Sequence, residues 1–194
     1  MQNALKKQIE ERNRENLKER RLRHVYAVAK LAREMALHYG EDPEKAELAA
    51  LCHDMFRSAE TEVLNDYIKK GGFPEYCLNN SNLAHSKAAV YEMEHKYGIT
   101  DPDLLNAVSF HTTGRAGMSV LEKIIYLADA AEPGRNYPGV KRLRALLMKD
   151  LDRACLQSLS RTVDYVNERG YFLAPDTLEA RDDLLQKIKE RQRS

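Results

Sequence analysis

Apolar residues along most of this chain recur three and four positions apart, which is the spacing of one helix face. The first clear stretch runs over residues 22–39, with apolar side chains at Leu22, Val25, Ala29, Ala32 and Ala36. We expect this helix to end at Tyr39 and Gly40, because glycine is common just past the end of a helix. His24 lies four positions before Val28, so we expect its side chain to face the protein core.

Two later helices share a start signal, and each ends at a histidine. Asp-Pro pairs at 42–43 and 101–102 combine a capping carboxylate with a proline that suits the first helical position. About ten residues further on, the chain reaches His53 in one case and His111 in the other. The helix before His53 presents small side chains on the face that it shares with this histidine, which lets a neighbouring helix come close. These are Ala46, Ala49 and Ala50.

The rest of the chain also favours helices, separated by stretches rich in glycine, proline and asparagine. We expect them near residues 60–69, 84–96, 119–129 and 140–169, and from 176 onward. Ser119 and Glu122 have the spacing of a capping box, and residues 71–83 are typical of a loop. No stretch keeps the alternation of a β-strand, so the sequence predicts an all-α fold in a single compact helical domain.

The N-terminal segment, residues 1–19, is densely charged with mixed signs. Its apolar residues Leu5, Ile9 and Leu17 form only a sparse stripe. We therefore predict a charged, solvated helix or arm in front of a domain that covers residues 20–194.

The composition of the chain argues against several classes of function. The 194 residues include 31 Lys and Arg against 30 Asp and Glu, so no strong overall field draws the chain to nucleic acid or a membrane. No apolar stretch approaches the roughly 20 residues of a membrane span, and no apolar signal core opens the chain. The isolated cysteines predict neither a disulfide framework nor a zinc–cysteine site, which suits a cytoplasmic setting. They are Cys52, Cys77 and Cys155.

The histidines and two aspartates carry the candidate chemistry. His38 and His95 each precede a Tyr-Gly helix end, where an imidazole suits the helix dipole, so we expect them on the surface. Asp54 and Asp129 end apolar runs, where an unpaired carboxylate is costly to bury. The remaining histidines lie on apolar faces or at helix edges beside loops. They are His24, His53, His85 and His111.

The order of these six residues resembles the H…HD…D signature of the HD superfamily of metal-dependent phosphohydrolases, with the two extra histidines of its binuclear members. Longer runs resemble the YqeK-like branch, the bacterial symmetrical bis(5'-nucleosyl)-tetraphosphatases. These runs are residues 111–115, 118–119, 121–129, 132–135, 137–140 and 177–181. The resemblance covers roughly residues 20–185. Arg57 stands where the pattern has lysine, and Asp182 where it has asparagine.

This resemblance implies an HD-domain enzyme that cleaves diadenosine tetraphosphate into two ADP by attack at an inner phosphorus. Two divalent cations would lower the pKa of a bridging water and neutralise phosphate charge. Nitrogen and oxygen ligands without thiolate suit iron, manganese or cobalt, with iron expected first, whereas zinc prefers four ligands. The six expected ligands are His24, His53, Asp54, His85, His111 and Asp129, with Asp54 able to bridge through its two oxygens.

Groups around the expected metals would bind the phosphates. We expect Arg57, one helical turn after His53, to act in catalysis with Asp54. Hydroxyl and backbone donors, two arginine clamps and an orienting carboxylate complete the predicted substrate site. These residues are Thr112, Thr113, Gly114, Arg115, Glu132 and Arg135.

Two alternatives remain open at this point. One is another HD nucleotide phosphohydrolase, acting on deoxynucleoside triphosphates, monophosphates or guanosine polyphosphates. The other is an HD module that binds nucleotides or a partner protein without catalysis. The expected partner is a nucleotide substrate, with no nucleic acid and no membrane, and a homodimer is left open.

Overall fold

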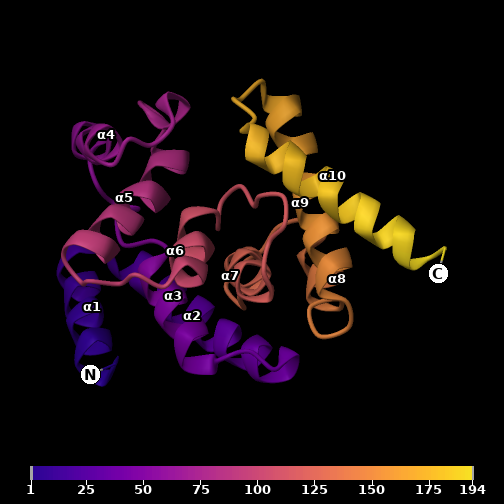
Figure 1. Cartoon of the computed structure of the whole chain (residues 1–194), viewed down its shortest axis with the longest axis horizontal. Helices are drawn as coiled ribbons and strands as arrows, with labels where there is room; N and C mark the ends of the chain where they lie inside the picture. Colours follow the sequence, from indigo (N-terminus) through magenta and orange to yellow (C-terminus); the bar gives the residue numbers. More distant parts are fainter. Residues whose placement is uncertain (1, 194) are drawn as a thin grey trace.

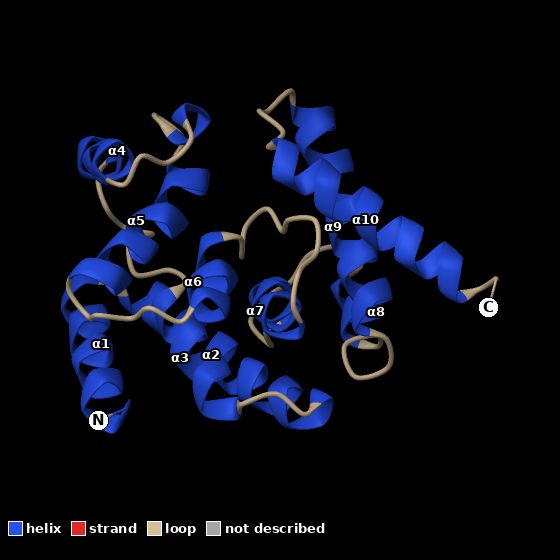
Figure 2. Cartoon of the chain, in the orientation of Figure 1, coloured by secondary structure: helices blue, strands red, loops and turns tan. Residues whose placement is uncertain are grey.

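The computed structural model describes residues 2–193, and within them the chain forms helices and loops without a strand (Figures 1 and 2). The predicted all-α fold is confirmed. The helices are α1 (Gln2–Asn16), α2 (Glu19–Tyr39), α3 (Pro43–Cys52), α4 (Thr61–Lys70), the 3-10 helix η1 (Glu75–Cys77), α5 (Ser81–His95), α6 (Pro102–Ser109), α7 (Val120–Ala131), α8 (Val140–Arg144), α9 (Leu151–Arg169) and α10 (Pro175–Arg191).

Local capping signals set the helix starts that matter for the site. The Asp42 carboxylate accepts hydrogen bonds from the first-turn amides of α3, and Asp101 does the same for α6. Ser119 and Glu122 form the predicted capping box at the start of α7. These contacts satisfy amide groups that have no partner inside a helix.

Helix α7 is the centre of the fold. It packs against α2, α3, α6, α8 and α9, and Figure 1 shows it end-on, with α1, α4 and α5 on one side and the C-terminal helices on the other. Leu121, Ile124, Ile125 and Leu127 lie in the core with at most 1% of their surface exposed. A helix held on several faces places the residues at its end rigidly, and α7 ends just after Asp129.

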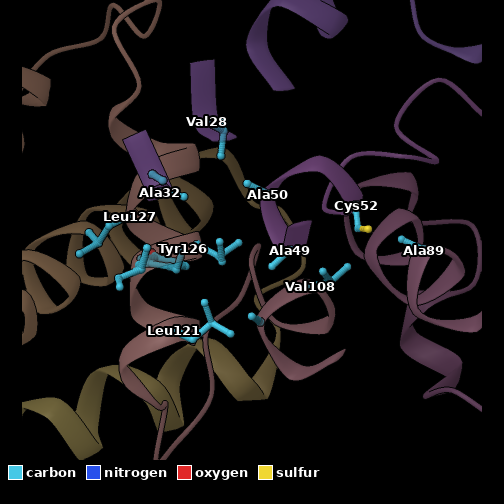
Figure 3. Close-up of a cluster of buried hydrophobic side chains, with 14 of the residues drawn as sticks. Val28, Ala32, Ala49, Ala50, Cys52, Ala89, Val108, Leu121, Tyr126 and Leu127 are labelled. Carbon is cyan, nitrogen blue, oxygen red and sulfur yellow. The ribbon is translucent and has the colours of Figure 1, made fainter. Parts of the chain in front are cut away.

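Helices α2 and α3 pack closely through small side chains, as the sequence predicted. Ala32 of α2 and Ala49 and Ala50 of α3 are fully buried. Figure 3 shows them in one cluster with Leu127 of α7 and Val108 of α6. Alanines allow two helix backbones to approach, because little side-chain volume separates them. This close pairing brings the start of α2 beside the end of α3.

The single long helix expected over 140–169 is wrong. The chain forms α8 and α9 with turns between them, and the Asp150 side chain accepts a hydrogen bond from the amide of Arg153 to begin α9. Leu143, Leu147 and Leu151 are all buried across the break. The apolar spacing therefore reports which side faces the core, but it does not show whether the backbone stays helical.

Helix α1 is less solvated than its charge suggested. Ile9 is fully buried, and Asn13 donates a hydrogen bond of 2.7 Å to the carbonyl of Leu51. Arg12 donates to the carbonyl of Met55 at 2.7 Å and to the Glu92 carboxylate at 2.7 Å. These polar contacts attach α1 to the backbone on both sides of residues 53–54. A search for apolar spacing overlooks them, because the side chains that make them are polar.

Three further sequence expectations concern the two surface histidines, the isolated cysteines and membrane spans. His38 and His95 are exposed, as predicted. Cys52, Cys77 and Cys155 are buried and free. No helix of residues 2–193 has the length and apolar character needed to cross a membrane.

Replacing Ile9 with alanine tests the packing of α1. We expect Ile9→Ala to lower the free energy of unfolding by about 2 to 5 kcal/mol, because truncating a fully buried side chain leaves a cavity. Urea unfolding followed by circular dichroism measures the loss. Lys7→Ala, at an exposed position of the same helix, should change stability by less than about 0.5 kcal/mol. Equal unfolding midpoints for the two variants would contradict the packing.

Candidate metal centre

The structure brings the six candidate ligands together from five parts of the chain. His24 comes from α2, His53 and Asp54 from the end of α3, His85 from α5, His111 from the turn after α6, and Asp129 from α7. The side chains of His53, Asp54, His85 and His111 are at most 4% exposed. Those of His24 and Asp129 are 9% and 22% exposed, so the cluster opens to solvent on their side.

Asp54 lies in the middle of the cluster and divides it in two. Its Oδ2 atom lies 3.6 Å from Nε2 of His24 and 3.4 Å from Nε2 of His53. Its Oδ1 atom lies 3.2 Å from Nε2 of His85 and 4.0 Å from Nε2 of His111. The two oxygens of one carboxylate thus face two separate pairs of histidines, which is the arrangement of a bridging ligand.

The spacing between the other ligand atoms fits divalent cations. Asp129 Oδ1 lies 2.9 Å from Nε2 of His24 and 3.9 Å from Nε2 of His53. The Nε2 atoms of His85 and His111 are 3.1 Å apart. Atoms that bind one metal at about 2.1 Å lie roughly 3 Å from each other. Two triads have all their ligand atoms within 4.8 Å of one another, near enough for small side-chain shifts to bring them onto one cation: His24, His53 and Asp129, and His53, Asp54 and His111.

Every histidine of the cluster is oriented through its other ring nitrogen. The Nδ1 atoms of His53, His85 and His111 donate to backbone carbonyls of Ala50, Ser81 and Val108, at 2.6, 2.9 and 2.8 Å. The Nδ1 atom of His24 lies 3.1 Å from the Glu132 carboxylate. A proton on Nδ1 leaves the lone pair of Nε2 free to bind a metal.

Some buried imidazole nitrogens of the cluster have no hydrogen-bond partner among the described residues, and a bound cation would satisfy them. The Nε2 atoms of His24 and His53 are buried and make no hydrogen bond in the described chain. Two lone pairs that face each other, as at His85 and His111, repel unless a cation or a proton lies between them. The residues present therefore fit divalent metal ions.

The electrostatics of the cluster favour the ligand forms of Asp54 and His111, whereas at His53 the lowering of the pKa by burial is outweighed by the nearby Asp54 and Asp129 carboxylates, which raise it. Burial alone raises the pKa of the Asp54 carboxyl, but the adjacent imidazoles of His53 and His85 hold it well below its ordinary value. Burial, together with the charges of His53 and His85, lowers the pKa of His111 to about 3. At pH 7 Asp54 is ionised and His111 is neutral, as metal ligands must be.

Comparison with known proteins identifies the family. The family model described as HD domain matches residues 21–134, more than half of the chain. The chain belongs to the HD domain family. The resemblance drawn from the order of histidines and aspartates is thereby confirmed.

Two relatives that match this HD-domain protein over most of their length carry the same name. The chain is 36% identical to the "Bis(5'-nucleosyl)-tetraphosphatase, symmetrical" of Bacillus subtilis (strain 168), over 84% of this chain and 89% of the relative. It is 37% identical to the protein of the same name from Halalkalibacterium halodurans, over 88% and 91%. A solved structure, of a predicted HD superfamily hydrolase involved in NAD metabolism from Clostridium acetobutylicum, superposes with a TM-score of 0.89. It shares 39% identity, and the match covers 93% of this chain and 97% of that one.

Glu132 and Arg135 contact two of the candidate ligands of this HD domain, His24 and Asp129. Glu132 is buried, contacts His24 and accepts the amide of Gly134 at 2.5 Å. The guanidinium of Arg135 donates to the Asp129 carbonyl at 2.7 Å and also pairs with the Asp129 carboxylate. The carboxylate that the sequence predicted to be an orienting group, Glu132, lies against Nδ1 of His24, and a role in orienting Arg135 or a water stays a prediction.

The turn after His111 is engaged mainly in the fold. Thr112 Oγ1 lies 3.3 Å from Nε2 of His111, so it borders the cluster. Thr113 is buried and donates to the carbonyl of Gly114. Arg115 makes two hydrogen bonds, of 2.7 and 2.5 Å, to the buried carboxylate of Glu122.

Gly114 is also explained by packing. Its φ of +66° suits glycine, and a Cβ atom there would lie 3.1 Å from the side chain of Ala180. The substrate roles of Thr113, Gly114 and Arg115 stay predictions. The contacts that these residues make within the fold do not favour such roles.

An open cleft of about 990 Å³ adjoins the HD cluster at His24. Among the predicted residues it is lined by Arg57, Glu132 and Arg135, and Tyr137 also faces it. Arg57 donates to Asn82 at 2.7 Å. None of residues 112–115 is among those that line the cleft.

Sequence reasoning missed Arg21. Its guanidinium donates to Oδ2 of Asp54 at 2.7 Å and lines the cleft. The available signal was its position three residues before His24, which places both side chains on one face of α2. The density of charge around it suggested a solvated segment instead.

Removing Glu132 tests how His24 is oriented. We expect Glu132→Ala to weaken binding of Mn²⁺ about 10- to 100-fold, because the ring of His24 loses the partner of its Nδ1 atom. Isothermal titration of metal-stripped protein measures this. Glu34→Ala, an exposed glutamate on the same helix as His24, is the matched control and should bind Mn²⁺ as the wild type does. Equal affinity of the two variants would refute the role of Glu132.

Proposed function

We propose that this protein is a symmetrical bis(5'-nucleosyl)-tetraphosphatase, which hydrolyses diadenosine tetraphosphate to two ADP. The observation that carries the proposal is the central carboxylate of Asp54, whose oxygens face two sets of metal-fitting histidines beside a basic cleft. The names of the relatives, which match over most of their length, support the substrate.

The proposed metal site holds two divalent cations. One set of ligands is His24, His53 and Asp129, and the other is His85 and His111, with Asp54 shared between them. Iron is the first candidate, and manganese or cobalt the next, because the ligands offer nitrogen and oxygen without thiolate. Bound cations would lower the pKa of a water molecule and neutralise charge on the phosphates.

The chain's own groups bind and orient the substrate. Arg57 and Arg135 line the cleft, so they can hold non-bridging phosphate oxygens. Thr112 offers a hydroxyl beside His111. Glu132 and the carbonyls behind the histidines keep the imidazole rings in place. Negative charge that develops on the leaving ADP is offset by these preoriented cationic groups.

A location in the cytoplasm stays a prediction, and the oligomeric state stays open.

The products of the reaction test the proposal directly. Attack at either inner phosphorus of the symmetric chain releases ADP as leaving group, so ADP should be the only nucleotide product. In water enriched in oxygen-18, one of each pair of ADP molecules should carry the label on its terminal phosphate. Chromatography that found ATP and AMP would refute symmetrical cleavage. Release of triphosphate from dGTP, with the dinucleotide untouched, would favour another HD nucleotide phosphohydrolase.

Asp129→Ala tests the proposed ligand set. We expect turnover of diadenosine tetraphosphate to fall below about a tenth of the wild-type value, because a cation loses an anionic ligand. Helical circular dichroism should be retained, since the side chains of α7 that pack in the core are unchanged. His38→Ala and His95→Ala, at exposed positions, should be near neutral. Turnover above that level would remove Asp129 from the ligand set.

A further inference from the structure

One wall of the cleft takes no part in the function proposed above. It is formed where α1 leads into α2, and its lining includes Lys18, Arg20, Arg21 and Arg23. Arg21 points inward to Asp54. Lys18, Arg20 and Arg23 are exposed, and we call these three side chains the basic rim.

The cleft concentrates positive charge that the chain as a whole lacks. Its lining contains six cationic side chains: Lys18, Arg20, Arg21, Arg23, Arg57 and Arg135. The only carboxylate in that lining, Glu132, is buried and engaged by His24 and the amide of Gly134. The net charge of the whole chain is only +1. A local excess of one sign in a concave surface attracts ligands of opposite charge.

Five of the six cations of the cleft fall into an inner and an outer group, and the sixth, Arg57, donates to Asn82. The inner arginines, Arg21 and Arg135, are paired with Asp54 and Asp129. In the outer group, Arg23 pairs with Glu19 in a solvent-exposed ion pair, which is a weak interaction. Among residues 2–193, neither Lys18 nor Arg20 has a carboxylate within ion-pair distance. The charge of the basic rim is therefore available to a ligand.

The size of the cleft indicates what that ligand is. A volume of about 990 Å³ lies at the upper end of the roughly 300 to 1,000 Å³ of small-molecule sites. One nucleoside diphosphate beside the metal cluster does not account for a cleft of this size. A dinucleoside tetraphosphate that is cleaved in the middle has a second half of the same size and charge on the far side of the broken bond.

We propose that the basic rim binds this second nucleoside diphosphate and so makes the protein select a long polyphosphate over a mononucleotide. The inference rests on the proposed function. The three side chains do not touch the reacting atoms, and they act on specificity through the affinity for the distal half. Lys18 and Arg20 precede the stretch that matches the HD domain family, residues 21–134, so this part of the site lies at the border of the shared domain.

The test is a triple variant, Lys18→Ala with Arg20→Ala and Arg23→Ala. We expect KM for diadenosine tetraphosphate to rise about tenfold, from the loss of three solvent-exposed charge contacts, with kcat within about twofold of the wild type. The dissociation constant of ADP, which needs only the inner half of the cleft, should change by less than about twofold. A rise of KM that is also smaller at high salt would fit the electrostatic origin.

Matched variants separate the specific effect from general charge. Lys7→Ala with Lys69→Ala and Lys189→Ala removes the same charge at exposed positions outside the cleft lining, and it should leave KM unchanged. Arg20→Lys with Arg23→Lys keeps the charge and should keep KM within about threefold. This variant also tests the rim if the triple variant does not fold, because a large rise in KM with the charge retained would contradict the electrostatic role.

The remaining results of these measurements distinguish failure of the basic rim from failure of the proposed function. An unchanged KM in the triple variant, or an equal loss in the control variant, overturns the role of the basic rim while the proposed function stands. Equal weakening of ADP and the dinucleotide also overturns it, because the rim would then serve the inner half. A wild-type protein that forms no ADP from the dinucleotide refutes the proposed function, and the inference about the rim falls with it.

Discussion

The burial of the Asp54 carboxylate is the constraint on which the rest of the structure depends. A buried charge without compensation costs several kcal/mol, and here four imidazoles and the guanidinium of Arg21 surround it. These partners come from α2, α3, α5 and the turn after α6, so the carboxylate can be satisfied only when those elements are packed around it. The site and the fold are therefore formed by the same contacts.

The backbone contributes as much to the geometry as the side chains do. At the ends of α3 and α6, carbonyls of the last helical turn accept the Nδ1 protons of His53 and His111. One contact uses a carbonyl of the last helical turn and orients an imidazole. This explains why both histidines stand at helix ends. Arg144 donates to three carbonyls at the end of α7 and in the turn after it, which holds Glu132 and Arg135 in position.

The charges of the site are arranged in order of depth. Carboxylates and imidazoles lie innermost, arginines paired with those carboxylates lie next, and solvated cations lie at the mouth of the cleft. Such an order suits a polyanion that must be attracted over a distance and then held by fixed groups. The electrostatics of the cleft thus carry more functional information than the near-zero net charge of the chain.

The sequence by itself determined the helical class, most helix starts and the residue types of the site, because these depend on local chemistry. Asp-Pro and Ser-x-x-Glu act within one turn, and a histidine or aspartate in an apolar run stands out wherever it lies. The break between α8 and α9 could not be seen, because leucines keep helical spacing on both sides of it. Arg115 and Arg21 had the same local signature, an arginine near a histidine, yet one pairs with Glu122 and the other with Asp54. Only the tertiary structure decided between them, since the partner of a long charged side chain is set by elements that are distant in sequence and adjacent in space.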